Sequence, residues 1–289
     1  MAHRLREIIA NPGIVVVPGA FNALVARVIQ DMGFPAVYAT GAGIANSTLA
    51  FPDVGLLSYK EILEAVRYIV DAVDIPVIAD ADTGYGGPVN VIRTVREFEK
   101  AGVAALQIED QLMPKRCGHF SGKQVITTEE MVQKVKAAVD TRIDPDLVII
   151  ARTDARSVTG LEDALYRAER YIEAGADMIF VEAPRSVEEL KLIGSRLRAP
   201  SIANMLEGGK TPLVPAAQLE EFGFKMVLYA NLALRASIKA CQEVLACLRD
   251  TGWSQPALSR IVSMDERNRL TRYDFIEEAE KRYNPNFRV

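Results

Sequence analysis

The sequence predicts a (β/α)₈ barrel, a TIM barrel of the α/β class, and three observations support this fold. Eight short apolar runs alternate with segments of helical periodicity along the 289 residues. The runs are continuously apolar, which is typical of parallel strands covered by helices. Phrases that join a helix end, a glycine and the next strand recur, as in 99–105. A doubly wound open sheet ranks second, because Val17–Ala20 lacks the glycine-rich phosphate fingerprint expected after its first strand.

Each predicted strand leads into one predicted helix, which is the repeating unit of such a barrel. The strands are expected at Ile14–Val17, Ala36–Ala39, Pro76–Ala79, Val103–Ile108, Leu147–Ala151, Met178–Val181, Ser201–Ala203 and Met226–Leu228. The helices are expected at Asn22–Met32, Tyr59–Val73, Val89–Lys100, Thr128–Thr141, Leu161–Ala174, Val187–Leu197, Ala216–Phe222 and Leu232–Arg249. Gly33, Gly175 and Gly223 stand directly after helices that they can end.

Residues 1–250 therefore form the predicted catalytic barrel, and residues 251–289 form a predicted helical arm. The arm contains two helical segments, Pro256–Val262 and Asp265–Arg282. Its apolar side chains need a surface to cover, which a neighbouring subunit or the chain's own barrel could provide. Both arrangements stay open at this point.

Composition excludes several classes of function. The formal net charge is −4 and charged residues make up 25% of the chain, so no affinity for nucleic acid or membranes is expected. No apolar run reaches transmembrane length, and no signal-peptide core follows the N-terminus. Three cysteines do not make a disulfide framework, and we expect a reduced, cytoplasmic protein.

Polar side chains follow nearly every predicted strand, at the end where barrel enzymes hold their active sites. Asp80 and Asp82 lie two apart on an extended segment and so face the same way. Asp53 and Glu109 could join them. Because these donors are all oxygens, the group predicts a site for Mg²⁺, with Mn²⁺ as the alternative, rather than Zn²⁺.

The segment Lys115–His119 follows the fourth strand and contains a cysteine between cations. Lys115, Arg116 and His119 could shift the pKa of the Cys117 thiol, which suits an acid or a nucleophile. The simpler interpretation is a surface loop with an idle thiol. After the second strand, Thr40–Gly43 offers backbone N–H groups to an oxyanion, although a flexible loop with positive φ explains the same glycines.

Three motifs together resemble the isocitrate lyase/phosphoenolpyruvate mutase superfamily. They are Lys115–His119, Asp80–Gly84 and Ala203–Pro212, and the likeness extends over nearly the whole chain in order. Within the superfamily the chain is similar to the 2-methylisocitrate lyases and to the 2,3-dimethylmalate lyase group. The resemblance implies a small carboxylate substrate and a barrel whose last helix is exchanged between subunits in a homotetramer, a dimer of helix-swapped dimers.

The resemblance also implies roles for individual residues. Asp82 would bind Mg²⁺ directly, with Asp53, Asp80 and Glu109 holding its waters. The substrate would be held by Tyr38, Thr40, Gly41, Ala42, Arg116, Gly118, Glu182, Asn204 and Arg235. Arg152 and His119 would stabilise developing charge, Lys115 would assist them, and Cys117 would protonate the product carbanion. Tyr38, Asp53 or a hydroxide on the metal could each be the base.

The implied reaction is cleavage of a 2-hydroxy di- or tricarboxylate to pyruvate and a second carboxylate. The Cys117 loop favours carbon–carbon cleavage, because the branch of the superfamily that acts on phosphorus–carbon bonds generally lacks it. Leu206 stands where methylisocitrate lyases typically carry a threonine and cannot hydrogen-bond a third carboxylate, whereas Arg235 could still bind one. An oxaloacetate hydrolase or decarboxylase, a phosphonate mutase and a non-catalytic carboxylate-binding barrel remain as alternatives.

Overall fold

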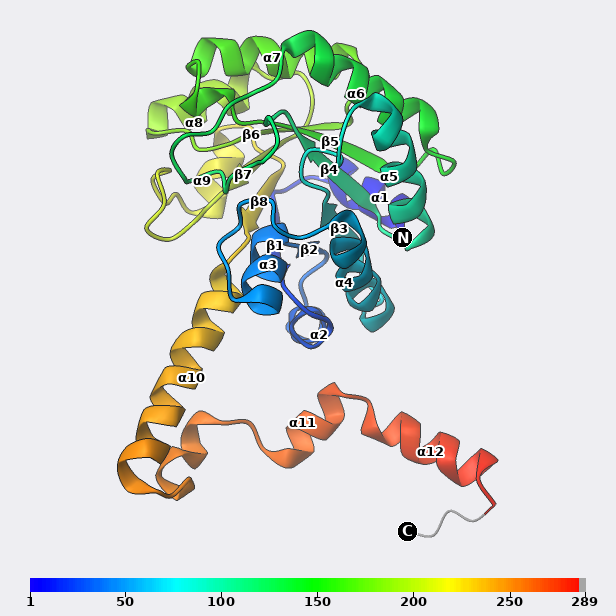
Figure 1. The fold of residues 1–289 in the computed structure, drawn as a ribbon, viewed down its shortest axis with the longest axis vertical. Coiled ribbons are helices and arrows are strands. Elements are labelled where there is room, and N and C mark those ends of the chain that lie inside the picture. Colours follow the sequence, from blue (N-terminus) through cyan, green and yellow to red (C-terminus); the bar gives the residue numbers. More distant parts are fainter. Residues whose placement is uncertain (286–289) are drawn as a thin grey trace. The chain divides into compact units, whose positions relative to one another are not determined.

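Eight parallel strands form a closed barrel in which neighbours in the chain are neighbours in the sheet (Figure 1). They are β1 (Val15–Ala20), β2 (Val37–Ala39), β3 (Val77–Asp80), β4 (Ala105–Glu109), β5 (Val148–Thr153), β6 (Met178–Val181), β7 (Ser201–Asn204) and β8 (Met226–Tyr229). The ring closes where Val15 of β1 pairs with Met226 of β8. The structure is a computed structural model that describes residues 1–285. It confirms the predicted (β/α)₈ fold.

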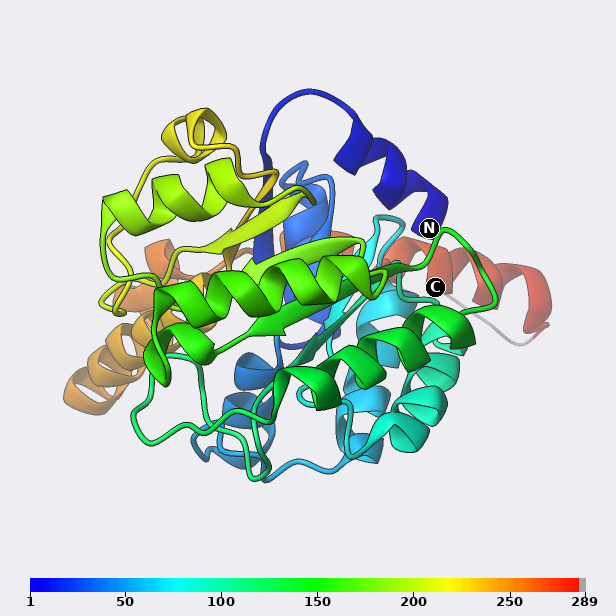
Figure 2. The same cartoon turned by 90° about the horizontal axis from the view of Figure 1, so that it is seen from above.

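The helices of the barrel lie outside the strands (Figures 1 and 2). Their bounds are α1 (Ala2–Ala10), α2 (Ala23–Asp31), α3 (Gly41–Leu49), α4 (Tyr59–Ala72), α5 (Pro88–Lys100), α6 (Thr128–Thr141), α7 (Leu161–Glu173), α8 (Val187–Arg196) and α9 (Ala216–Glu221). The sequence predicted seven of these within a few residues. It missed α1, which precedes the first strand, and α3, which has few of the charged residues that mark an outer helix.

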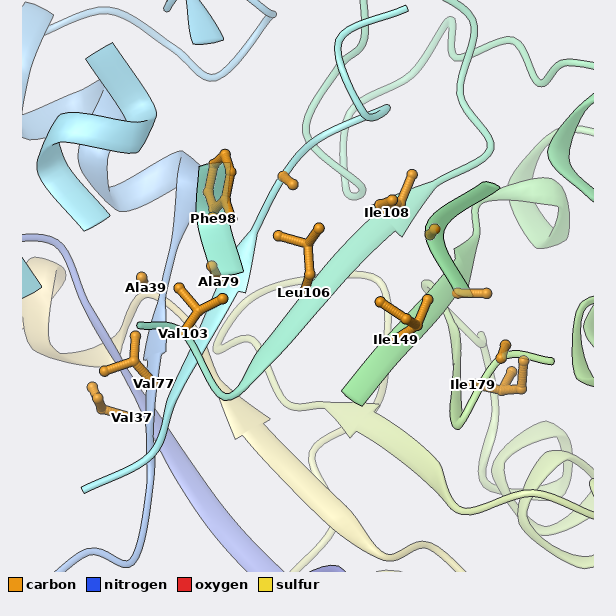
Figure 3. Close-up of a cluster of buried hydrophobic side chains, with 14 of the residues drawn as sticks. Val37, Ala39, Val77, Ala79, Phe98, Val103, Leu106, Ile108, Ile149 and Ile179 are labelled. Atoms are coloured by element: carbon orange, nitrogen blue, oxygen red, sulfur yellow. The ribbon is translucent and has the colours of Figure 1, made fainter. Parts of the chain in front are cut away.

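Both faces of the strands are buried, which explains why their sequences are continuously apolar. Alternate residues face outward and pack against the surrounding helices. Figure 3 shows this layer, where Val77 and Ala79 of β3 lie near Phe98 of α5. The other residues of each strand fill the barrel interior, among them Ile78, Ile150 and Phe180. Every strand is therefore fixed from two sides, and its polar carboxyl end is held in a defined place.

Helix α1 covers the amino ends of the strands. Leu5 is completely buried and packs with the side chains that fill the barrel interior. Arg6 donates hydrogen bonds to the carbonyl of Asp146, just before β5, and to the carboxylate of Asp177, just before β6. Arg142 donates to the same Asp177 carboxylate from the end of α6, over 2.6 Å. This end of the barrel is closed.

The chain divides into two compact units, Met1–Ala233 and Leu234–Val289. The second contains most of α10 (Leu232–Thr251), a 3₁₀ helix (Gln255–Arg260), α11 (Met264–Leu270) and α12 (Tyr273–Tyr283). The first helical segment expected in the arm, at 256–262, is a 3₁₀ helix at Gln255–Arg260. The second, expected at 265–282, is broken at Thr271 and Arg272, where Arg272 has φ 54°.

The packing of the arm on a neighbouring subunit stays a prediction, as does its start at residue 251. Among the described residues, no helix is both long and apolar enough to span a bilayer.

Candidate active site

A pocket opens among the residues at and after the carboxyl ends of the strands, as the sequence predicted. It brings together fourteen of the predicted site residues: Tyr38, Thr40, Ala42, Asp53, Asp80, Glu109, Lys115, Arg116, Cys117, Gly118, His119, Arg152, Glu182 and Asn204. The remaining predicted residues are Gly41, Asp82 and Arg235. Gly41 and Asp82 adjoin this group, because a Cβ on Gly41 would lie 3.0 Å from Asp80 Oδ2 and 3.6 Å from Asp82 Oδ1. Arg235 belongs to the second unit, and its role stays a prediction.

Near the end of β3, two aspartate carboxylates form ion pairs with the same lysine. Lys115 Nζ lies 2.5 Å from Asp53 Oδ1 and 2.6 Å from Asp82 Oδ1. Asp82 reaches this position because its backbone is left-handed, with φ 47°, and its N–H donates to Asp80 Oδ1. Burial raises the pKa of Asp82 to about 6 even though Lys115 opposes the shift. Burial alone would lower the pKa of Lys115, but Asp82 and Asp53 raise it well above its ordinary value.

The donor set at this place fits a magnesium ion. Among residues 1–285, no three acidic, histidine or cysteine side chains gather closely enough to hold a metal ion. Mg²⁺ needs no such cluster, because one or two carboxylates and several waters suffice. Glu109 Oε1 is buried without a hydrogen-bond partner and is available as an oxygen donor near Asp80 and Asp82. The four predicted metal residues therefore stay a prediction that the chemistry of this group supports.

Arg152 is the centre of a second, buried charge cluster. Its guanidinium donates to Asp154 through Nε at 2.9 Å and through Nη2 at 3.2 Å. The same group lies 3.3 Å from Glu109 Oε2, 3.2 Å from Glu182 Oε2 and 5.1 Å from the ring centre of Phe180. Burial opposes the charge on Arg152, but the three carboxylates raise its pKa well above the ordinary value. The guanidinium is therefore permanently charged and held in one orientation.

His119 is oriented by the loop after β7. The backbone N–H of Lys210 donates to His119 Nδ1 at 3.2 Å, which leaves the ring proton on Nε2. Nε2 lies 3.3 Å from Glu182 Oε1. Gly209 permits this approach, because a Cβ there would lie 2.8 Å from His119 Nδ1. The imidazole can thus present an N–H to an anion in the pocket.

Cys117 sits in the pocket as a protonated thiol. Its backbone N–H donates to the carbonyl of Asp53 at 2.9 Å, which fixes the cysteine beside the predicted metal residues. Burial raises the pKa of Cys117, and the negative charges of Asp53 and Glu182 add to this effect.

The expectation that neighbouring cations tune this thiol needs correction. Lys115 pairs with Asp53 and Asp82, and Arg116 Nη1 donates to the carbonyl of Ser121 at 3.3 Å. Neither cation is therefore directed at Cys117. Sequence order placed them next to the cysteine, but the turn of the loop points them away.

Thr40–Gly43 is the start of a helix, which rules out the alternative of a flexible loop. Thr40 caps α3 by accepting a hydrogen bond from the N–H of Gly43 at 3.3 Å. Gly41 and Gly43 do not have positive φ, so backbone freedom does not explain these glycines. Gly41 instead allows the first turn to approach the Asp80 carboxylate. The first turn of a helix has N–H groups without intrahelical partners, which suits an oxyanion.

Tyr38 is the middle residue of β2, the strand that leads into this turn. Burial, followed by the negative charge of Asp80, raises the pKa of Tyr38 well above its ordinary value. Tyr38 therefore keeps its proton at neutral pH. This favours a role as hydrogen-bond donor over the role of base.

Several pocket residues were not predicted as site residues. Phe180 and Leu228 join Leu206, which the sequence analysis named for its effect on substrate class, in an apolar wall of the pocket. Phe180 and Leu228 lie within strands, where core residues look the same, and so gave no signal. Asn231 follows β8 and also lines the pocket, and its Oδ1 is buried without a partner. Its place at a strand end was a usable signal.

Comparison with known proteins identifies the family. The family model described as phosphoenolpyruvate phosphomutase matches residues 5–249. The chain belongs to this family. It is 46% identical to 2,3-dimethylmalate lyase from Eubacterium barkeri, over 98% of each chain. It is 47% identical to a 2-methylisocitrate lyase from Aeropyrum pernix, over 96% of this chain and 89% of the relative.

These relatives are carbon–carbon lyases by name, and the chain is an enzyme of this type within the phosphoenolpyruvate mutase/isocitrate lyase superfamily. A solved structure of a phosphonopyruvate hydrolase in complex with oxalate and Mg²⁺ is 30% identical. It superimposes with a TM-score of 0.88 over 98% of each chain. The superfamily resemblance inferred from the three motifs is confirmed.

Proposed function

We propose that this enzyme is a Mg²⁺-dependent lyase that cleaves a 2-hydroxy dicarboxylate into pyruvate and a second carboxylate. The observation that supports it most is the half-buried Cys117 thiol, whose pKa burial raises, in one pocket with the Arg152 guanidinium. A carbanion formed there would meet an acid that still holds its proton and a cation that stabilises negative charge.

Each group has a role in the proposed reaction. When bound, Mg²⁺ would supply positive charge that makes the 2-hydroxyl more acidic. Tyr38 and the first turn of α3 would hold the end of the substrate that becomes pyruvate. Arg152 and His119 would stabilise the enediolate formed when the C2–C3 bond breaks. Cys117 would give its proton to the enediolate carbon and be left as a thiolate.

A base must take the hydroxyl proton, and Asp53 is the candidate that the side chains support best. The raised pKa of Tyr38 argues against that residue, because it would have to lose its proton first. Asp53 lines the same pocket, and its carboxylate lies 2.5 Å from Lys115 Nζ. The same proton can then return to the Cys117 thiolate through solvent, which completes the cycle.

The apolar wall supports an alkyl-substituted dicarboxylate, such as 2,3-dimethylmalate, as the substrate. Phe180, Leu206 and Leu228 offer no hydrogen bond to a third carboxylate, and a carboxylate without a partner is costly to bury. Methyl groups would gain favourable contact with the same surface. Asn204 adds one carboxamide, whose Oδ1 is buried without a partner. The contribution of Arg235 to a third carboxylate stays open.

The test of substrate class is pyruvate release with 2,3-dimethylmalate and 2-methylisocitrate side by side, with and without Mg²⁺. We expect Mg²⁺-dependent release and a higher kcat/KM for the dicarboxylate. A preference for the tricarboxylate would mean that Arg235 or another group outweighs the apolar wall. Release from neither, with oxalate formed from oxaloacetate or turnover of a phosphonate, would refute the proposed substrate.

The test of the acid role is Cys117→Ser. A hydroxyl is a far weaker acid than a thiol, so turnover should fall by about 10²- to 10⁴-fold while substrate binding persists. Cys241→Ser is the matched control, because Cys241 is an exposed cysteine in α10 of the second unit. Isothermal titration would measure binding. If Cys117→Ser lost binding and not turnover, the acid role would be wrong.

We also propose that the enzyme is a homotetramer built from helix-swapped dimers, in the cytoplasm. Large exposed apolar side chains on the second unit support this assembly, among them Trp253, Phe275 and Tyr283. Light scattering should give a mass of four chains. A chain that ends at residue 250 should give a lower mass, and an unchanged mass would show that the arm does not hold the assembly together.

A further inference from the structure

The loop that contains Cys117 is held at its base and at its tip. At the base, Gln111 and Val125 form an antiparallel bridge, and the N–H of Leu112 donates to the carbonyl of Gln124 at 2.9 Å. These contacts close the loop but do not fix its far end. Before the tip, Lys115 pairs with Asp53 and Asp82, and the N–H of Cys117 donates to the carbonyl of Asp53. The residues after Cys117 are held by other groups.

Lys123 makes the buried contact at this tip. Its ammonium donates to the carbonyl of Gly118, the residue after Cys117, and lies 2.5 Å from Asp154 Oδ1. Both side chains are almost completely enclosed, with 1% of Lys123 and 0% of Asp154 exposed. A buried ammonium is costly unless it is paired and hydrogen-bonded. This lysine therefore has a single favourable position, which ties the loop to the end of β5.

Asp154 connects this contact to Arg152. The same carboxylate accepts hydrogen bonds from the Arg152 guanidinium at 2.9 and 3.2 Å. The backbone of Asp154 is also fixed, because its N–H donates to Asp110 Oδ1 at 2.9 Å. Gly118 packs directly on the Arg152 guanidinium, since a Cβ on Gly118 would lie 2.6 Å from Arg152 Nη2. The loop tip and the guanidinium therefore share one support.

Two other contacts of the segment after Cys117 are weaker candidates for this support. Lys210 Nζ donates to the carbonyl of Phe120 at 3.3 Å, and Arg116 donates to Ser121, but both contacts are exposed to solvent. Neither ends on a carboxylate. Water can replace such hydrogen bonds at little cost, whereas it cannot reach the contact of Lys123.

We propose that Lys123 is a positioning residue that latches the Cys117 loop onto Asp154, so that Cys117 and Arg152 are held in register over the pocket. The lysine does not touch the reacting atoms. The statement that the latch serves turnover rests on the proposed lyase function. The statement that it holds Cys117 in place does not, and the two can be tested separately.

The experiment compares Lys123→Met with Lys225→Met. Lys225 also donates to two loop carbonyls, those of Asn11 and Gly13, but at the start of β8 and thus at the opposite end of the barrel. Both changes are made in a chain with Cys241→Ser and Cys247→Ser, so that iodoacetamide reacts only at Cys117. Thermal unfolding confirms that each variant is folded. The readouts are the rate of Cys117 alkylation and, separately, kcat and KM.

We expect Lys123→Met to alkylate at Cys117 at least tenfold faster, because the freed loop exposes the thiol. A displacement of about 1 Å is enough to lower kcat on the order of 10²-fold, and KM should change much less. Lys225→Met should match the parent chain in all three quantities. Unchanged alkylation in folded Lys123→Met would overturn the latch, whatever happens to turnover.

Lys123→Arg covers the case in which the methionine variant does not fold. It keeps the positive charge beside Asp154, but the larger guanidinium does not fit the enclosed space of the ammonium. We expect faster alkylation of Cys117 in this variant too, and alkylation at the parent rate would overturn the proposal. Because alkylation needs no substrate, a failure of the proposed lyase reaction leaves this test intact.

Discussion

The two ends of the barrel are built from the same strands but treat their polar groups differently. At the amino end, the Asp177 carboxylate accepts hydrogen bonds from Arg6 on one oxygen and from Arg142 on the other. The N–H of Ile149 donates to this carboxylate as well. Leu5 of α1 fills the opening of the barrel interior. This carboxylate is satisfied by the protein itself.

At the carboxyl end, the fold leaves polar atoms without partners. Glu109 Oε1, Asn204 Oδ1 and Asn231 Oδ1 are all buried without a hydrogen bond within the described chain. Orphaned buried groups are unfavourable and rare in folded proteins. All three line the pocket, where a bound ligand would complete them. We therefore expect the carboxyl end to serve binding and chemistry and the amino end to serve stability.

The largest effect should come from removing the central cation of the carboxyl end. Arg152→Met leaves three buried carboxylates without their common partner, so we expect a loss of about 3–5 kcal/mol in the free energy of unfolding. Turnover should fall on the order of 10²- to 10³-fold. Arg6→Met makes the same change at the other end and should cost on the order of 1 kcal/mol with normal kcat. Equal effects of the two changes would contradict the comparison.

Leu5→Ala tests the closed end by itself. Truncating a fully buried leucine leaves a cavity and should lower the free energy of unfolding by about 2–5 kcal/mol. Activity per folded molecule should not change, because Leu5 lies at the end opposite the pocket. Thermal unfolding and kcat at a temperature below the transition would measure the two quantities. A loss of kcat in fully folded protein would show that the ends are coupled.

The pH dependence of the free energy of unfolding should show a smaller effect, which comes from Glu182 at the carboxyl end of the barrel. Burial alone would raise the pKa of Glu182, but Arg152 and His119 lower it below the ordinary 4.5. Because the pKa of Glu182 is lower in the folded chain than in the unfolded chain, its negative charge stabilises the folded state above pH 4.5. This stabilisation is lost as the pH falls towards the folded-state pKa and Glu182 becomes protonated. Glu182→Gln should therefore be less stable than the parent at pH 7, and the difference should shrink below about pH 4. Urea unfolding at several pH values measures it, and a difference that grew on acidification would contradict the assignment.

The smallest change in stability is expected from removing an ion pair that is exposed to solvent. Arg170 and Glu173 form an ion pair on the exposed surface of α7. Exposed pairs contribute between zero and about 1 kcal/mol, so Arg170→Ala should leave the unfolding midpoint nearly unchanged. A large loss would mean that pairing alone, and not the burial that distinguishes Asp177 and Arg152, accounts for the stability of charged groups here.

The sequence was sufficient for the features that depend on local pattern. Continuous apolar runs identified all eight strands, because parallel strands buried on both faces leave no polar alternation. The rule that barrel sites gather at strand ends found Arg152 and Glu182 from their positions alone. Helix α3 escaped detection, because a start rich in glycine and small residues has little periodicity and is made helical by its packing near Asp80.

What only the tertiary structure decided is which charges meet. The sequence placed Lys115 and Arg116 beside Cys117 and suggested that they tune its thiol. In the folded chain Lys115 pairs with Asp53 and Asp82, and burial instead raises the pKa of Cys117.

The same holds for Lys123, whose contact with Asp154 spans 31 positions and leaves no trace in either segment. Sequence pattern therefore determined the barrel, and it named fourteen residues that the structure brings into one pocket. The partners of its buried charges were decided by the three-dimensional arrangement, because electrostatic contacts form between groups that the chain itself keeps far apart.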